Sequence, residues 1–169
     1  MHEKNGMSCG ARLVMALALA LQAWPAIAAP PDGGAEIVSL QGKGEYRVPA
    51  ETRWRDAAVR QQLGQGNFVR TGDSSRMGVL LHDQTQIRLA ANSMLQIKQV
   101  GDNRDRTTVL NQSAGRSWTQ SKNVPNRLTV ETPSALAAIR GTDWELVVDE
   151  DGSSTLTVLS GEVLLSNDQ

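Results

Sequence analysis

The residue types that carry most enzymatic chemistry are scarce beyond the first 28 positions of this sequence. That part of the chain contains one histidine, His82, and no cysteine, because Cys9 lies within the first 28 residues. A cysteine nucleophile is excluded there, and a Ser-His-Asp relay could use only His82. Zinc sites usually combine several histidines and cysteines, and the glycine-rich motifs that bind nucleotide phosphates are missing. We therefore expect no enzyme activity, no cofactor and no metal site.

An acidic run near the C-terminal end could hold a cation. Asp149, Glu150 and Asp151 could direct several carboxylate oxygens at one ion. The run lacks the alternating spacing of calcium loops, and Asp151-Gly152 is a common pair in hairpin turns. We interpret the run as a turn, and an enzyme that uses Asp149 and Asp151 is the least favoured alternative.

The middle of the chain is locally basic and contains a tryptophan in a polar setting. Its cations are Arg104, Arg106, Arg116, Lys122 and Arg127. They could bind an anion or an acidic protein surface, although charges on solvent-exposed strands and loops would give the same pattern. Trp118 either caps the core or anchors an interface. Trp118, Arg116 and Lys122 are therefore the candidate interface residues.

The first 28 residues have the features of an export signal. Lys4 and Arg12 precede an apolar run from Leu13 to Ala20, and Ala26-Ile27-Ala28 matches the small-x-small pattern that signal peptidase cuts. The run is shorter than the roughly 20 apolar residues of a membrane-spanning helix. We expect a cleaved signal peptide at residues 1–28 and export to the periplasm, with no transmembrane helix in the mature chain.

One domain follows this signal. Residues 29–35 form a Pro- and Gly-rich lead-in, and residues 36–169 carry the regular apolar pattern. Without Glu3, Lys4 and Arg12 the chain has 15 basic and 17 acidic residues, a net charge of −2. This balance does not suggest a nucleic acid partner, since such proteins usually concentrate basic charge. About 140 residues without a disulfide can still bury an adequate apolar core.

Short apolar runs separated by turn residues predict an all-β domain of short antiparallel strands. Residues 144–148 and 155–159 alternate between two faces, and turns recur at a spacing of roughly 8–12 residues. Helical spacing occurs only at 53–63, through Trp54, Ala58 and Leu63, so we expect at most one short helix there. No strict repeat period is present, so a β-solenoid and a β-sandwich both remain open.

The four residues Arg140-Gly141-Thr142-Asp143 separate two apolar runs and could form a ligand loop or a structural corner. Gly141 permits a backbone bend that a residue with a Cβ resists. Thr142 and Asp143 can bond their own backbone at a bend, and Arg140 can reach carbonyl or carboxylate oxygens with its planar fork. We favour a corner that leads Trp144 into the core.

Several stretches together resemble the FecR domain, the periplasmic module of FecR-type sigma regulators and of many exported proteins. In chain order they are Trp54 and four short segments: Val69-Arg70-Thr71-Gly72, Leu128-Thr129-Val130-Glu131-Thr132-Pro133, Ile139-Arg140-Gly141-Thr142-Asp143-Trp144 and Val158-Leu159-Ser160-Gly161-Glu162-Val163. The residues that carry the resemblance are Trp54, Thr71, Gly72, Pro133, Arg140, Gly141, Thr142, Trp144 and Gly161. It extends from about residue 36 to the end, and implies an all-β, solenoid-like or sandwich-like domain that binds partners and has no known catalytic role.

The resemblance leads to two functional hypotheses. The first is a non-catalytic protein-interaction or signal-relay module in a Gram-negative periplasm, with strand addition at an exposed sheet edge as the mode of binding. The second is a glycan- or peptidoglycan-binding module of a larger envelope protein, in which Trp118 or Trp54 stacks on sugar rings. The partner stays unidentified in both.

The sequence departs from the regulators in one respect. Those proteins place a cytoplasmic sigma-binding region and a membrane helix before the domain, whereas only a signal-like segment precedes it here. Direct anti-sigma activity is therefore not carried over to this chain. We also leave open a continuation of the domain beyond residue 169 with further strands or modules.

Overall fold

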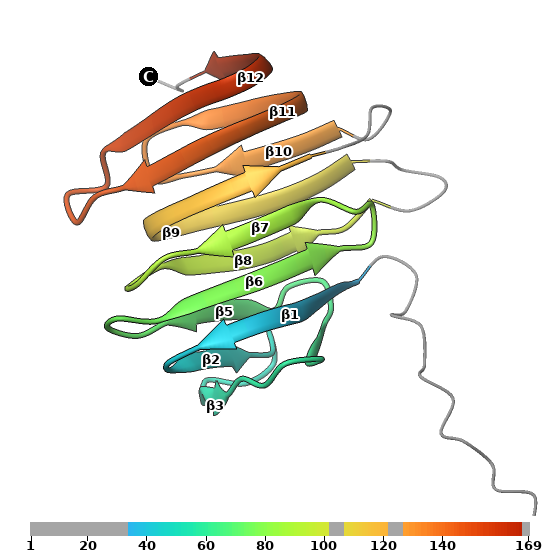
Figure 1. The fold of residues 1–169 in the computed structure, drawn as a ribbon, viewed down its shortest axis with the longest axis vertical. Helices are drawn as coiled ribbons and strands as arrows, with labels where there is room; N and C mark the ends of the chain where they lie inside the picture. Colours follow the sequence, from blue (N-terminus) through green and yellow to red (C-terminus); the bar gives the residue numbers. More distant parts are fainter. Residues whose placement is uncertain (1–33, 102–106, 122–126, 167–169) are drawn as a thin grey trace, which may run out of the picture.

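The computed structural model describes residues 34–101, 107–121 and 127–166. Within these ranges the chain forms twelve strands and no helix, which confirms the all-β prediction (Figure 1). The strands are β1 (Ala35–Gln41), β2 (Gly44–Arg47), β3 (Arg55–Asp56), β4 (Gln62–Leu63), β5 (Phe68–Thr71), β6 (Arg76–Leu81), β7 (Gln86–Leu89), β8 (Met94–Gln99), β9 (Thr107–Gln120), β10 (Arg127–Glu131), β11 (Leu136–Val148) and β12 (Ser154–Ser166). The expected signal peptide lies outside the described residues.

Residues 53–63 form two short strands instead of the helix considered from the sequence. β3 pairs with β2, and β4 pairs with β1. Between them, the N–H of Arg60 donates to the carbonyl of Ile37 (2.7 Å), and the N–H of Ile37 donates to the carbonyl of Gln61 (3.0 Å). A helix this short is marginal by itself, so pairing with a buried strand decides the conformation.

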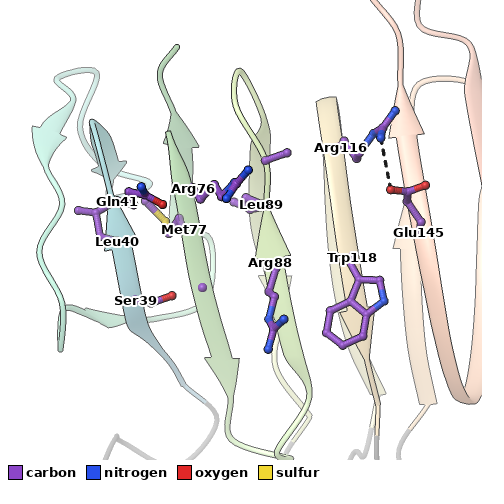
Figure 2. A pocket seen from close by; sticks show the side chains of 12 residues that line it. Ser39, Leu40, Gln41, Arg76, Met77, Arg88, Leu89, Arg116, Trp118 and Glu145 are labelled. Atoms are coloured by element: carbon purple, nitrogen blue, oxygen red, sulfur yellow. Dashed lines mark ion pairs between the residues drawn. The ribbon is translucent and has the colours of Figure 1, made fainter. Parts of the chain in front are cut away.

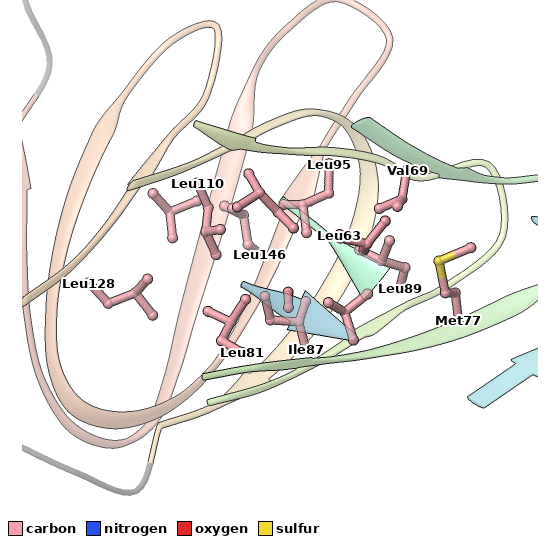
Figure 3. Packing of buried hydrophobic residues seen from close by; sticks show 14 of the residues in the cluster. Leu63, Val69, Met77, Leu81, Ile87, Leu89, Leu95, Leu110, Leu128 and Leu146 are labelled. Atoms are coloured by element: carbon pink, nitrogen blue, oxygen red, sulfur yellow. The ribbon is translucent and has the colours of Figure 1, made fainter. Parts of the chain in front are cut away.

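All twelve strands belong to one curled sheet. β2, β5 and β8 lead to the first part of β9, whereas β1, β6 and β7 lead to its second part. The two halves of the sheet therefore face each other, and their buried side chains form one cluster (Figure 3). Pairing is antiparallel except between β9 and β10, which run parallel. The result is a curled half-barrel, which lies between the solenoid and the sandwich left open above.

The strands β9, β11 and β12 are 13 or 14 residues long, and each passes from one half of the sheet to the other. The first part of β9 pairs with β8 and β10, and its second part pairs with β7 and β11. Glycines with positive φ lie at the transitions in β9 (Gly115, φ 80°) and β12 (Gly161, φ 92°). Such a φ bends the strand and favours glycine, because a Cβ would clash with the backbone.

The segment from Arg140 to Asp143 lies inside β11, so the predicted corner is a bend within one strand. The register of β11 against β12 shifts twice, between Arg140 and Asp143 and again at Trp144. Before the shift β11 pairs with β10, and after it β11 pairs with β9. The segment is therefore a bulge that bends one continuous strand. Trp144, which follows it, is fully buried.

The core between the two halves is mostly aliphatic. Its members are Ala35, Ile37, Leu63, Val69, Met77, Val79, Leu81, Ile87, Leu89, Leu95, Ile97, Leu110, Leu128, Val130, Ala137, Ile139, Trp144, Leu146 and Val148. Trp144 is the one aromatic residue in this cluster. Across the residues that the structure describes, no helix is long and apolar enough to cross a membrane.

Candidate functional site

A row of side chains crosses the outer face of the sheet at one level. Adjacent strands β1, β6, β7, β9 and β11 place Ser39, Gly78, Arg88, Trp118 and Glu145 opposite one another in register. Successive residues of a strand alternate between faces, so these five share the outer face, while the residues on either side of them in β6, β7, β9 and β11 are buried. Figure 2 shows Arg88 and Trp118 side by side on this face.

A groove of about 420 Å³ runs over this row, and we call it the arginine groove. Gly78 contributes no side chain, so the groove passes over β6 between Ser39 and Arg88. The lining residues on the outer face are Ser39, Gln41, Arg76, Gly78, Arg88, Ala90, Arg116, Trp118 and Glu145, whereas Leu40, Met77 and Leu89 line the groove from below with their side chains in or against the core. Gly78, Ala90 and the Trp118 ring form its apolar part, and the rim carries three arginines and one carboxylate.

The charges of the arginine groove are incompletely paired. Arg116 lies 3.6 Å from the carboxylate of Glu145, and both side chains are exposed to solvent. The guanidinium of Arg88 lies over the ring of Trp118, 4.9 Å from its centre. Arg76 and Arg88 are exposed and form no ion pair with any residue that the structure describes. The groove therefore offers two guanidinium groups to an incoming anion.

Buried hydrogen bonds position the part of β9 that carries Arg116 and Trp118. The hydroxyl of Ser93 bonds both the carbonyl and the N–H of Arg116, each at 3.0 Å. Thr71 in turn accepts a hydrogen bond from the N–H of Ser93 (3.0 Å) and donates to the carbonyl of Ala90 (2.5 Å). The end of β5 and the turn before β8 thus hold the second part of β9 in place.

A second surface, which we call the open edge, lies at the β12 end of the sheet (Figure 1). Among the described strands, β12 pairs only with β11. The large apolar side chains exposed there are Leu136 (38 %), Val158 (42 %), Leu159 (60 %) and Leu164 (71 %). Val158 lies opposite the buried Trp144 and so faces the core side of the sheet, yet it stays partly exposed because no described strand follows.

Trp54 lies in an aromatic and cationic cluster at the opposite end of the molecule. The guanidinium groups of Arg70 and Arg47 lie 4.2 and 5.3 Å from the centre of its ring. Phe68 contacts the ring edge to face, with 6.5 Å between the ring centres. Arg70 also pairs with Glu45 at 2.7 Å. The faces of Trp54 are therefore occupied by side chains of this chain.

The acidic run forms the hairpin turn between β11 and β12, as predicted. The N–H of Gly152 donates to the carbonyl of Asp149 (3.0 Å), and the N–H of Ser153 donates to the carboxylate of Asp151 (2.9 Å). This backbone hydrogen bond lowers the pKa of Asp151 from its ordinary value. No cluster of three or more metal-ligating residues occurs in the described part of the chain. His82 is exposed in the turn between β6 and β7.

The structure brings together two of the three candidate interface residues. Arg116 and Trp118 both line the arginine groove, whereas Lys122 lies outside the described residues. The side chain of Trp118 is partly buried. It therefore neither closes off the core completely nor stands fully exposed as an interface anchor. The side chains of Arg140, Gly141 and Thr142 also lie outside the description, whereas Pro133 is exposed in the turn before β11.

Sequence reasoning missed Arg76, Arg88 and Glu145 as members of the groove. None of the three belongs to a motif that indicates a binding site in the sequence. Their meeting depends on strand order, because β6, β7, β9 and β11 are adjacent in space but not all consecutive in sequence. The alternation of Gln86-Ile87-Arg88-Leu89 indicates that Arg88 faces outward. It does not indicate which strands lie beside Arg88 in the sheet.

A family model described as FecR protein matches residues 67–164, which is more than half of the chain. The chain belongs to the FecR family. The resemblance that we derived from its motifs is thereby confirmed, although Trp54 lies before the matched range.

One solved structure is similar to this FecR-family chain. It is a crystal structure described as that of a candidate anti-sigma factor from Parabacteroides distasonis, with 12 % sequence identity and a TM-score of 0.44. The similarity covers 60 % of this chain and 59 % of that one. No curated protein matches the sequence.

Proposed function

We propose that this FecR-family chain is a non-catalytic binding domain of the periplasm, which recognises a protein partner and relays a signal through that contact. The open edge carries the proposal. β12 has 13 residues with no proline and a single charged residue, Glu162. Long edge strands usually carry lysines, prolines or other features that prevent pairing with a further strand. The signal-like N-terminal segment supports the periplasmic location.

Strand addition is the mode of binding that fits this edge. An extended segment of the partner would pair with the backbone groups of β12 that bond no described strand. Apolar side chains of that segment would cover Val158 on the core side and Leu164 on the outer side, both of which are exposed in the isolated chain. Burying such surface stabilises a complex by about 25 cal/mol per Å² before the cost of association.

A crosslinking pull-down of the tagged, full-length protein from periplasm tests this proposal. Leu159→Lys and Leu164→Lys place charges on the open edge without touching the core, so we expect each to abolish recovery of the partner. Val59→Lys is the matched control, because Val59 is 50 % exposed and lies between β3 and β4, far along the sheet from β12. Equal recovery from all three variants would refute the open edge as the binding surface.

A glycan-binding module is the second function considered from the sequence. Two guanidinium groups lie over the ring of Trp54 and one lies over the ring of Trp118, so a sugar that stacks on those positions would have to displace an arginine. This arrangement favours a protein partner. Recovery of murein without any protein in the pull-down would support the glycan-binding function instead.

A further inference from the structure

The arginine groove lies on a different surface from the open edge. Its lining residues come from β1, β6, β7, β9 and β11 on the outer face of the sheet, and β12 contributes none of them. Its floor and rim come from strands held by the core and by the Ser93 hydrogen bonds described above. The groove is therefore available whether or not a partner strand occupies the edge.

Arg88 is held in an orientation suited to an anion. Its guanidinium lies over the Trp118 ring, a cation–π contact that restricts the side chain. The N–H groups of a stacked guanidinium lie in its own plane, so they remain free to bind the two oxygens of a carboxylate. Arg76 lies on the adjacent strand β6 and adds a second unpaired cation to the same rim.

The rest of the groove selects against a highly charged ligand. Glu145 stands at one side, 3.6 Å from Arg116, and would repel a surface made of many phosphates. The apolar part of the groove, Ala90 and the partly buried Trp118 ring beside Gly78, instead suits an apolar side chain. A volume of about 420 Å³ holds a few side chains, which is the scale of a short peptide segment.

We propose that the arginine groove binds a protein segment in which an aspartate or glutamate lies beside an apolar side chain. The carboxylate pairs with Arg88 beside Trp118, Arg76 adds positive charge to the same rim, and the apolar side chain covers Gly78 and Ala90 beside the Trp118 ring. The Arg116–Glu145 pair lies where it can bond the amides of the bound segment. This site is separate from the strand addition proposed for β12, and each can fail without the other.

Fluorescence anisotropy with a labelled peptide tests the site. The probe is a hexapeptide of alternating Leu and Glu, blocked at both ends, and its counterpart has Gln in place of Glu. We expect the Glu peptide to bind at least about tenfold more tightly, Arg88→Gln to weaken its binding by about tenfold, and Arg76→Gln to weaken it by a smaller factor. Arg127→Gln is the matched control, because Arg127 is an exposed arginine on β10 and should leave affinity unchanged.

The outcomes separate this proposal from its alternatives. Equal affinity for the two peptides, or no effect of Arg88→Gln and Arg76→Gln, would overturn it. Arginine-dependent binding to phosphatidylglycerol vesicles without binding to the Glu peptide would assign the groove to a membrane surface and overturn it as well. The Leu159→Lys variant should bind the Glu peptide like the wild type. Its failure to do so would show that groove and edge are not independent.

Discussion

Gln112 shows how a single buried polar residue shapes the surface that carries Trp118. It is fully buried in β9, where its amide donates to the carbonyl of Gly115 (2.9 Å) and accepts from the hydroxyl of Ser117 (2.6 Å). These bonds span the place where β9 changes halves of the sheet. Buried polar groups without partners are costly, so this amide specifies the bend as well as stabilising it.

Replacing Gln112 therefore tests the bend at the level of one side chain. Gln112→Met keeps the volume but leaves the Ser117 hydroxyl and the Gly115 carbonyl without their partner, so we expect a loss of about 1–3 kcal/mol in unfolding free energy. Urea denaturation measures it. Gln41→Met, at an exposed glutamine, should change stability by less than about 0.5 kcal/mol. Similar stability of the two variants would contradict this role.

Glu45 gives the molecule a defined response to acid. The hydrogen bond from Arg70 holds the pKa of this carboxyl below its ordinary value of 4.5, and the nearby charges of Arg70 and Lys43 act in the same direction. A carboxyl with a lowered pKa stabilises the folded state above its unfolded pKa and loses that contribution as pH falls through the folded value. Glu45 should thus stabilise the fold at neutral pH and not in strong acid.

The expected result is a pH-dependent cost of Glu45→Gln. The variant should be less stable than the wild type near pH 7, and the difference should shrink as the pH falls well below 4.5. Denaturant titrations at several pH values measure it. Glu150→Gln, at an exposed position of the β11–β12 turn, serves as the control. A difference that stays constant with pH would show that the Arg70 pair does not set this response.

At the scale of elements, the long strands are defined by their bends. β9 changes its inward-facing residues from Leu110 and Gln112 to Ser117 and Thr119, so the alternation shifts by one position across the bend. β11 does the same through its bulge, and β12 through Gly161. These shifts let one strand contribute core side chains to both halves of the curled sheet.

Gly115 lies at the bend of β9, where a larger side chain does not fit. Its φ is 80°, and an added Cβ would meet the Ser93 Oγ, the Ser93 Cα (2.5 Å) and the Asn92 carbonyl oxygen (2.6 Å). We expect Gly115→Ala to cost about 2–4 kcal/mol in thermal or urea unfolding, because both the backbone and the packing are strained. Gly64→Ala is the matched control, with nothing within 4 Å of its added Cβ. A stable Gly115→Ala protein would contradict the bend as described.

At the scale of the whole molecule, the curled sheet has two unlike ends and one grooved face. The β3 and β4 end is formed by short strands, with the Trp54 ring enclosed by Arg47 and Arg70. The other end is the long strand β12, where apolar side chains stay exposed. This asymmetry places the proposed strand-addition surface at one end and the arginine groove on the outer face beside it, so the two proposed sites do not overlap.

The sequence predicted more of the backbone structure than of the candidate site. Alternation and turn residues identified the strands and the hairpin at Asp149–Gly152, because both depend on residues close in sequence. The bulge between Arg140 and Asp143 was predicted only as a corner, since a glycine between two apolar runs is typical of a turn and of a bulge alike. Of the residues that line the groove, Arg116 and Trp118 were predicted as interface residues. The others were missed because they come from strands whose order in the sheet no local pattern specifies.

The amino-acid sequence by itself determined the fold class, the family and the scarcity of catalytic side chains, because each follows from residue types and short-range order. The tertiary structure alone decided that β12 pairs with no second strand among the described residues and that Arg76, Arg88 and Trp118 share one face. These are consequences of strand pairing between residues far apart in the chain. Hydrogen bonding across the sheet, and not local preference, selects those neighbours.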